Sequence, residues 1–460
     1  MQLSLLYLSA FPENKTHMKK LQVFAVLFLI LQNCFSQDVA KLNKLMDIYA
    51  AQYKFNGSAL VVHHGKILLD KGYGLRRAID SNRNDPNSIY QIGSITKQFT
   101  STIIMKLQEE KKLSVKDKLS KYFPDYPKGD SITIEHLLTH TSGIYSYTDN
   151  DNFMKNEVTK PSDRKKMMAL FKDKPLEFTP GTKWNYSNSG YSLLGYIIED
   201  VTKMPYETAV HQYIFKKAGM LHSGFDFTHL TDKNKATGYS SLNKNGNTPS
   251  LIVDSSVSYS AGAIYSTTGD LYKWFQAMQA NSIISAASKK QAQTPVMNKY
   301  GYGWGIDSFP GKRTIGHSGG IHGFNSDMIS IPEDSTTVIL LANINTSLSS
   351  MMQNIFAILF NIPFELPKER IETVLPEDVL KQYVGVYDLN AQIIIHVTFK
   401  DGKLIAQAEG QGPLQLHPEK IDSFFLREIE AEIIFNRNEK KEVISLTLHQ
   451  GGQNTNGKKR

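Results

Sequence analysis

Apolar residues recur at two different spacings in the first part of this chain. From Val39 to Ile48 they follow helical intervals, which predicts a helix with one buried face over residues 38–52. Two strand-like runs follow, Ala59–His63 and Ile67–Tyr73, and a short His-Gly-Lys turn separates them. Runs joined this closely are predicted to pair as an antiparallel hairpin.

A second group of strand-like runs appears much later in the chain. It comprises Arg313–Gly316, Phe324–Ile331 and Thr336–Asn343, and a helix is predicted after it over Ser347–Phe360. Helical patterns and loops dominate the residues between the two groups. We therefore predict an α+β fold in which one antiparallel β-sheet, built from both ends of the domain and flanked by helices, lies beside a mostly helical region. A cleft between the two regions is the expected place for an active site.

The composition changes after this unit. Residues 366–377 are rich in Pro and Glu, which is typical of a linker, and a C-terminal domain over residues 378–460 follows. Within it, residues 378–450 read as short alternating strands separated by turns such as KDGK and EGQG. This predicts a small all-β domain with a barrel or sandwich architecture. The predicted main domain then occupies residues 37–365.

Residues 1–36 have the pattern of a secretory signal. Lys19 and Lys20 precede an apolar run over Leu21–Leu31, which is shorter than the roughly 20 residues that span a bilayer. Met18 stands just before the two lysines and is an alternative start site. The single cysteine, Cys34, lies in this leader, so cleavage after residue 36 leaves a mature chain without thiols. We predict an exported protein, periplasmic or secreted, without a transmembrane segment; a lipid anchor on Cys34 is the alternative, although Leu-Gln-Asn-Cys is a poor lipoprotein box.

Charge and potential metal ligands exclude several classes of function. The net charge is +8, but Lys and Arg are scattered, so no basic stripe for nucleic acid is expected. His136 and His140 are four residues apart, a spacing that can place two metal ligands on one helix face. No acidic third ligand accompanies them, and the stretch reads more simply as a helix ending at Gly143. We therefore expect neither a metal nor a cofactor.

The first candidate catalytic motif is Ser94-Ile95-Thr96-Lys97, at the start of a helical pattern. Residues three apart share a helix face, so the Lys97 amine is expected near the Ser94 hydroxyl. A serine hydroxyl needs an adjacent base, and a buried lysine can lose its proton near neutral pH and act as one. Taken alone, the motif is also explained by a serine that caps the helix.

Two further stretches carry polar groups suited to catalysis. Tyr186-Ser187-Asn188 follows a Pro-Gly turn, and a helix is predicted from about Ser189. A tyrosine near a lysine can act as a general acid or base, and Asn188 offers a donor and an acceptor to a substrate amide. In isolation, a turn with a half-buried aromatic residue explains the same pattern.

The second stretch, residues 316–320, matches G-x-S-x-G, the signature of a nucleophilic serine on a strand-to-helix elbow. The residues that follow read as two strands and a turn rather than as a helix, which argues against Ser318 as a nucleophile. His317-Ser318-Gly319 is instead predicted to end a strand, and the glycines allow a substrate to approach the backbone closely.

These motifs, in this order, resemble the serine β-lactamase and penicillin-binding-protein superfamily, in particular class C β-lactamases, D-stereospecific peptidases and related esterases. The resemblance covers residues 38–365 and rests on six blocks: YQIGSITKQFT, ITIEHLLTHTSGI, FTPGTKWNYSNSGYSLLGYIIE, SAGAIYSTTGDLYKW, YGYGWG and GHSGGIHGFNS. It implies that Ser94 is the acylated nucleophile and that Lys97 and Tyr186 transfer protons as a pair. The region after residue 370 resembles a β-rich domain that is often appended to such hydrolases.

The same resemblance assigns the substrate-binding groups. It implies that Asn188 orients the substrate and that the backbone N–H of Gly320 joins that of the nucleophile in an oxyanion hole. His317, Ser318 and Gly319 would line the edge strand beside the substrate.

One departure from the family pattern bears on specificity. Many β-lactamases and carboxypeptidases have a lysine where His317 stands, and a histidine with an ordinary pKa of about 6.5 is mostly neutral at pH 7. We therefore predict a serine hydrolase that cleaves an amide or ester, such as a small ester or a peptide containing D-amino acids, with peptidoglycan as one source of such peptides. The alternatives are a β-lactamase and a penicillin-binding sensor that stays acylated. The sequence does not indicate an oligomeric state.

Overall fold

The computed structural model describes residues 37–368, 370–390, 393–426, 431–450 and 453–460. The predicted signal region, with Cys34, lies outside the described residues. Within the described ranges, no helix combines the length and the apolar character needed to cross a membrane.

A six-stranded antiparallel sheet forms the centre of the main domain, in the order β2-β1-β12-β11-β10-β9. Its two halves come from opposite ends of the domain, because β1 pairs with β12 in a register that sets Leu60 opposite Ile339. The strands are β1 (Gly57–His63), β2 (Lys66–Tyr73), β9 (Gly305–Phe309), β10 (Lys312–Ile321), β11 (Phe324–Ile331) and β12 (Thr336–Ala342).

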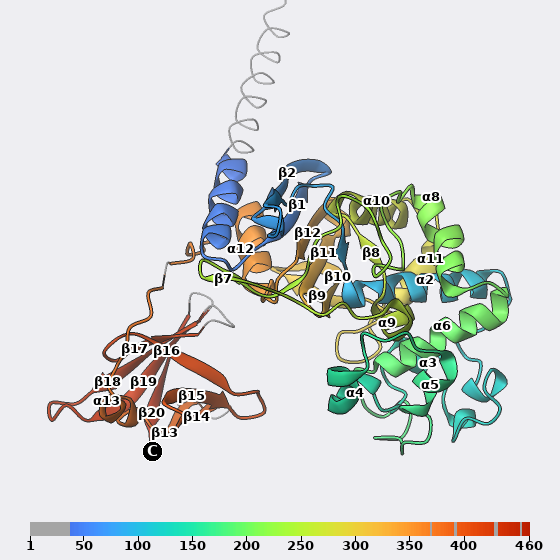
Figure 1. Cartoon of the computed structure of the whole chain (residues 1–460). Coiled ribbons are helices and arrows are strands. Elements are labelled where there is room, and N and C mark those ends of the chain that lie inside the picture. The colour runs from blue at the N-terminus through green and yellow to red at the C-terminus, as the bar shows by residue number, and fades with distance from the viewer. Residues whose placement is uncertain (1–36, 369, 391–392, 427–430, 451–452) are drawn as a thin grey trace, which may run out of the picture.

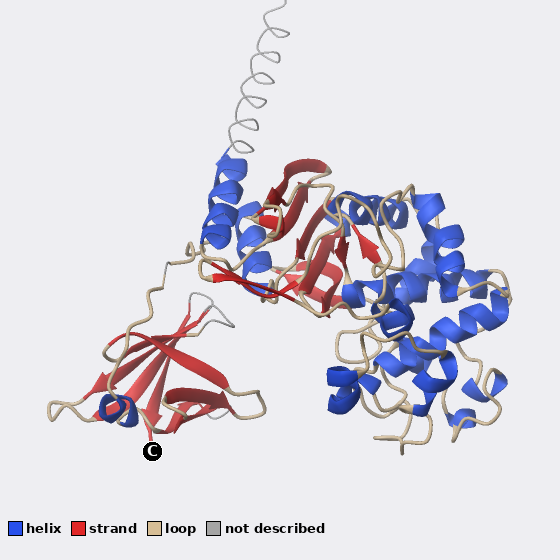
Figure 2. Cartoon of the chain, in the orientation of Figure 1, coloured by secondary structure: helices blue, strands red, loops and turns tan. Residues whose placement is uncertain are grey.

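The two faces of the sheet bury different cores. Successive strand side chains point to opposite faces, so Leu60 and Val62 join the core shared with the helical region, whereas Ala59 and Val61 join a second core. Helical residues 37–51 and α12 (Ser349–Leu359) cover that second face and lie side by side in Figure 1. The predicted α+β architecture is confirmed, and Figure 2 shows the strands between the two groups of helices.

Helix α2 (Thr96–Glu109) lies at the centre of the helical region and packs against α6, α9 and α11. Its residues from Thr96 to Met105 are all buried. The other helices are α3 (Ile134–Leu138), α4 (Asp151–Asn156), α5 (Arg164–Ala169), α6 (Asn188–Thr202), α7 (Tyr206–Val210), α8 (Lys216–Ala218), α9 (Ser255–Gly262), α10 (Thr268–Gln279) and α11 (Ala286–Ala292). Short strand pairs complete the region: β3 (Leu75–Arg77) with β4 (Asn82–Arg83), β5 (Tyr90–Gln91) with β8 (Tyr265–Ser266), and β6 (Tyr239–Asn243) with β7 (Gly246–Pro249).

Two details of the sheet differ from the sequence-based prediction. Strand β10 continues beyond Gly319 to Ile321, where it pairs with Phe324 of β11. Glycine is a poor strand former, so its pairing depends on the neighbouring strand rather than on local preference. Strand β9 was not predicted, because it is a short edge strand with few apolar side chains.

The C-terminal strands close into an antiparallel barrel that follows α13 (Glu377–Lys381). Its strands are β13 (Gly385–Asn390), β14 (Ile393–Lys400), β15 (Lys403–Ala408), β16 (Leu414–Lys420), β17 (Ser423–Phe425), β18 (Ala431–Arg437), β19 (Val443–Gln450) and β20 (Gln453–Lys459). The predicted barrel-like domain is confirmed. Strand β20 was missed because its sequence, QNTNGKK, is polar throughout; it closes the barrel by pairing Lys458 with Asp388 of β13.

Candidate active site

Ser94 lies at the N-terminal end of α2, facing the sheet. It belongs to a 3₁₀ turn, Gly93–Ile95, that leads directly into the helix. Gly93 has φ +50°, a backbone conformation that glycine adopts without the strain of a side chain. Lys97 comes one helical turn later and is fully buried.

The Lys97 amine is surrounded by oxygen atoms from three parts of the chain. Its Nζ lies 2.9 Å from Ser94 Oγ, 2.8 Å from Asn188 Oδ1 and 2.9 Å from the backbone carbonyl oxygen of Ala261. Burial holds the pKa of Lys97 well below its usual range, because the charged form loses its hydration. The structure therefore brings the serine and the lysine of the first motif into direct contact.

Tyr186 and Asn188 join this cluster from the loop before α6 and from the first residue of that helix. The Tyr186 ring centroid lies 4.8 Å from Lys97 Nζ, and its hydroxyl is hydrogen-bonded to Ser94. Burial raises the pKa of Tyr186, and the contact with Ser94 offsets part of that effect. The side-chain amide of Asn188 donates to Thr148 Oγ1 at 3.1 Å, so its orientation is fixed from both ends.

His317 lies on β10 beside the cluster and is half-buried. Its Nδ1 is 2.5 Å from the backbone oxygen of Ser318, and its Nε2 is 2.7 Å from the hydroxyl of Tyr300. Burial and, secondarily, the nearby Lys97 lower the pKa of His317 to about 4. This lowered pKa agrees with the expectation, from the sequence, that the His317 imidazole is neutral at pH 7.

Ser318 is the predicted site residue whose side chain lies apart from the others. Strand alternation points it to the opposite face of β10 from His317, and it is exposed. The chain continues from β10 into β11 through a turn, so no strand-to-helix elbow is formed. Ser318 contributes its backbone carbonyl, which accepts from His317 Nδ1–H.

Two glycines let the Ser94 turn dock against β10. A side-chain carbon built on Gly319 would lie 2.1 Å from the carbonyl oxygen of Ile92, and one on Gly93 would lie 2.8 Å from the backbone nitrogen of Gly320. The backbones of these two segments are therefore in contact, with Gly320 next to the nucleophile turn.

This close approach predicts that alanine destabilises the fold at one of two neighbouring glycines and not at the other. Gly319→Ala should lower the free energy of unfolding by about 2 to 3 kcal/mol, because its methyl group meets fixed backbone. Gly320→Ala is the matched control, since the nearest atom to its methyl group is a side-chain nitrogen of Asn325 at 3.6 Å. Thermal unfolding of both variants checks this prediction, and equal melting temperatures would contradict the docking.

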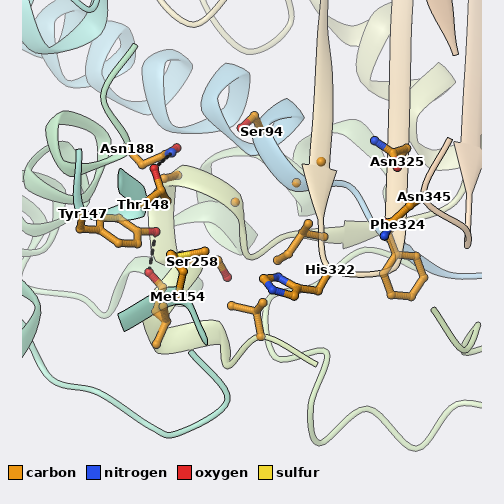
Figure 3. Close-up of a pocket in the computed structure, with 17 residues that line it drawn as sticks. Ser94, Tyr147, Thr148, Met154, Asn188, Ser258, His322, Phe324, Asn325 and Asn345 are labelled. Atoms are coloured by element: carbon orange, nitrogen blue, oxygen red, sulfur yellow. Dashed lines mark hydrogen bonds between the residues drawn. The ribbon is translucent and has the colours of Figure 1, made fainter. Parts of the chain in front are cut away.

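A cavity of about 450 Å³ opens next to Ser94 (Figure 3). It is lined by Gly93, Ser94, Tyr147, Thr148, Met154, Asn188, Val253, Val257, Ser258, Ala261, Gly262, Gly320, Ile321, His322, Phe324, Asn325 and Asn345. Hydroxyl and amide side chains line this cavity together with apolar ones, and no Lys, Arg, Asp or Glu is among the lining residues. The cavity can therefore hold an uncharged group that offers both apolar surface and hydrogen bonds.

Comparison with known proteins places the main domain in one family. The family model described as "Beta-lactamase" matches residues 34–360. The chain belongs to the beta-lactamase family. A second model, "Domain of unknown function (DUF3471)", matches residues 369–459, which include the barrel. Family members of this type are serine acyl-transfer hydrolases.

Relatives of this beta-lactamase family member include penicillin-binding proteins and an amidohydrolase. The chain is 34% identical to the putative penicillin-binding protein PbpX of Bacillus subtilis, over 69% of this chain and 78% of that protein. The octameric penicillin-binding protein homologue from Pyrococcus abyssi has a TM-score of 0.66 at 29% identity, covering 92% of this chain and 100% of the homologue. A D-stereospecific amidohydrolase from Streptomyces sp. has a TM-score of 0.57 at 25% identity, covering 68% and 98% of the two chains.

His140 also lies at this site, although the sequence did not predict it there. His140 follows α3 with φ +59°, and its ring centroid lies 4.1 Å from that of Tyr186. Its Nδ1 accepts the backbone N–H of Ser187 at 3.1 Å, and burial, with Lys97 and His317 nearby, holds its pKa well below the ordinary range. In sequence, the four-residue spacing between His136 and His140 is instead typical of a pair of metal ligands.

The two histidines in fact serve different purposes. His136 accepts the backbone N–H of Thr133 and thereby caps α3, so it does not face His140 as a second ligand. Across the described ranges, no group of three or more His, Cys, Asp or Glu residues is arranged to hold a metal ion. Tyr300 was not predicted either, because nothing in its sequence neighbourhood indicates that its hydroxyl meets His317.

The low pKa of His317 predicts a specific loss of stability in acid. Below the ordinary histidine pKa of 6.5, the unfolded chain binds the proton more readily than the folded chain, so the free energy of unfolding falls as pH falls toward about 4. His317→Gln does not titrate and should lose less stability between pH 7 and 4.5, by on the order of 1 kcal/mol for this half-buried group. Urea unfolding at both pH values measures the difference; equal losses would contradict it.

Proposed function

We propose that this protein is a serine hydrolase that cleaves an ester or an amide through an acyl-enzyme on Ser94. The observation that carries the proposal is the contact of Lys97 Nζ with Ser94 Oγ, Asn188 Oδ1 and the Ala261 carbonyl oxygen. A buried amine with a lowered pKa is predominantly neutral at a lower pH than an exposed lysine. It can then accept a proton.

The hydrogen-bond partners define where the free electron pair of a neutral Lys97 points. Amide and carbonyl oxygens only accept hydrogen bonds, so Asn188 and Ala261 take the two N–H groups of the amine. The lone pair then faces Ser94, whose O–H becomes the donor. This arrangement makes Lys97 the general base that activates the serine hydroxyl.

The remaining groups complete a balanced acyl transfer. Attack forms the bond between Ser94 Oγ and the substrate carbonyl carbon, moves the serine proton to Lys97, and places negative charge on the carbonyl oxygen. The backbone N–H groups of Ser94 and Gly320 are the proposed donors to that oxygen. Collapse breaks the bond to the leaving group, which takes a proton from Tyr186, and Tyr186 recovers it from Lys97. Water then repeats these steps on the acyl-enzyme.

We propose small esters and peptides containing D-amino acids as the substrates. Support comes from the neutral His317 in place of a fixed positive charge, from the uncharged cavity, and from the D-stereospecific amidohydrolase among the structural relatives. A screen of the full chain against short acyl esters, D-amino-acid amides, D-Ala-D-Ala peptides and nitrocefin tests this proposal. Nitrocefin as the best substrate would identify a β-lactamase instead.

A penicillin-binding protein that stays acylated is the second candidate function, because a curated relative at 34% identity carries the name of a putative penicillin-binding protein. The lifetime of the acyl-enzyme separates the two functions. Recovery of free enzyme within minutes after exposure to a fluorescent penicillin supports turnover. An adduct that persists for hours supports the binding protein.

We also propose that the protein is exported, on the basis of Lys19, Lys20 and the apolar run Leu21–Leu31. Expression of the full sequence in a bacterial host with a cell envelope is expected to yield an exported product that begins near residue 37. N-terminal sequencing of that product tests the cleavage site. A cytoplasmic product that retains residues 1–36 would contradict the proposal, and a lipid on Cys34 would identify an anchored form.

A further inference from the structure

We propose that Tyr300 sets which substrates this site accepts, because its hydroxyl holds His317 as an imidazole without a free N–H. The site then takes esters and amides whose leaving group carries no carboxylate. The inference rests on the proposed function, and it concerns the leaving-group side of the same site.

Both ring nitrogens of His317 are already hydrogen-bonded. A carbonyl oxygen only accepts, so the contact of Nδ1 with the Ser318 carbonyl requires the ring proton to be on Nδ1. In a neutral imidazole Nε2 is then an acceptor, and the Tyr300 hydroxyl lies 2.7 Å away. This hydroxyl also contacts that of Tyr191, which itself donates to the Leu138 carbonyl, and we assign the Tyr300 proton to Nε2 of His317. His317 is left with no N–H to offer to a substrate carboxylate.

Tyr300 is held firmly in this position. Its side chain is 7% exposed and packs against the rings of His140 and Trp184, at centroid distances of 4.9 and 6.2 Å. Its backbone closes a tight turn in which Asn298 and Lys299 both have positive φ, and its N–H and C=O bond to Met297 and Val296. The hydroxyl cannot leave His317 without disturbing this packing.

Lys97 is the cation whose charge acts on His317, and it does not replace the missing charge. Lys97 is buried, and its amine already contacts three oxygens. The cavity next to Ser94, which His317 does not line, includes no Lys or Arg either. A carboxylate brought next to His317 would lose water without gaining an ionic partner, which disfavours it relative to a neutral group of the same size.

A matched pair of esters tests this selectivity. Methyl 3-acetoxybenzoate and 3-acetoxybenzoate transfer the same acetyl group, so both form the same acyl-enzyme and share its hydrolysis. Their leaving groups differ in one carboxylate. The wild-type full chain is expected to favour the methyl ester by at least about tenfold in kcat/KM at pH 7, and a preference for the carboxylate would overturn the proposal.

Tyr300→Phe removes the hydroxyl while keeping the ring. Nε2 of His317 is then free to bind a proton, in surroundings whose other titratable groups are Lys97, His140 and Tyr186. A bound carboxylate favours the protonated ring, whereas burial and Lys97 still oppose it, so the ratio of kcat/KM values should shift toward 3-acetoxybenzoate at pH 6 and shift less at pH 8. A tyrosine with a purely structural role would lower both kcat/KM values equally and leave the ratio and its pH profile unchanged.

Tyr302→Phe is the matched control, because the hydroxyl of Tyr302 bonds to Glu135 rather than to His317. This variant should keep the wild-type ratio. His317→Lys supplies a fixed charge and should raise the relative rate with 3-acetoxybenzoate even if Tyr300→Phe fails to fold. An unchanged ratio in both variants would overturn the proposal.

Failure of the underlying function would look different. If Ser94→Ala still hydrolysed both esters, then the acyl-enzyme proposal itself would be wrong. If hydrolysis depends on Ser94 but the ratios do not move, only the role of Tyr300 is rejected.

Discussion

Replacing Ser94 with alanine is expected to abolish hydrolysis and covalent labelling by a fluorophosphonate or a fluorescent penicillin. The variant removes the Oγ that lies 2.9 Å from Lys97, while the turn, the cavity and the other polar groups stay in place. Loss of a catalytic serine in comparable hydrolases costs about 10⁴-fold or more in rate, because no other group can form the acyl-enzyme. Steady-state kinetics with a short acyl ester, together with gel fluorescence, measures both effects.

Ser318→Ala is the matched control for this variant. Ser94 lies in the turn before α2 and Ser318 lies on β10, and these two segments meet at the site. Ser318 also fits a serine-hydrolase signature in sequence. Its exposed side chain points to the other face of β10, so labelling and hydrolysis should stay within about twofold of wild type. The reverse result, with labelling lost in Ser318→Ala and kept in Ser94→Ala, would require a different catalytic centre.

Replacing Lys97 with methionine should lower kcat/KM by about 10²- to 10⁴-fold, the usual contribution of a general base. Methionine occupies a similar volume but cannot take the proton from Ser94. The wild-type pH profile should also change in a definite direction. Lys97 acts when it is neutral, so kcat/KM rises with pH through its lowered pKa, and this ascending limb should disappear in the variant.

Lys106→Met provides the control for Lys97→Met on the same helix. Lys106 lies in the last turn of α2, where it pairs with Glu109 away from the site. Its replacement should leave both the rate and the pH profile nearly unchanged. If Lys97→Met kept the ascending limb, the base would have to be another group, and Tyr186 would be the first to examine.

The main architecture could be predicted from the sequence because it follows from local pattern. Runs such as Phe324–Ile331 alternate between two buried faces, and the helix after Ser94 follows from its apolar spacing. Strands β9 and β20 carry no such pattern. They form because a neighbouring strand leaves backbone groups that must be paired, and that condition arises only in the folded chain.

The site was predictable to the extent that its chemistry lies in adjacent residues. Ser94, in the turn that leads into α2, and Lys97, in the first turn of that helix, are three residues apart, so their contact follows from helical geometry. The third contact of Lys97 is a backbone carbonyl at Ala261, and a carbonyl leaves no mark in a sequence. The bond from Tyr300 to His317 likewise joins a turn to a strand, and only the fold brings the two together.

The measurement that tests the central claim most directly is the location of the acyl group on the protein. The full chain is mixed with a slowly hydrolysed acyl ester or a penicillin, quenched in acid within seconds, digested and mapped by mass spectrometry. The proposed mechanism predicts one added acyl group, on the peptide that contains Ser94, and none in Ser94→Ala. An adduct on the peptide that contains Ser318, or hydrolysis with no adduct under conditions that trap acyl-enzymes, would contradict it.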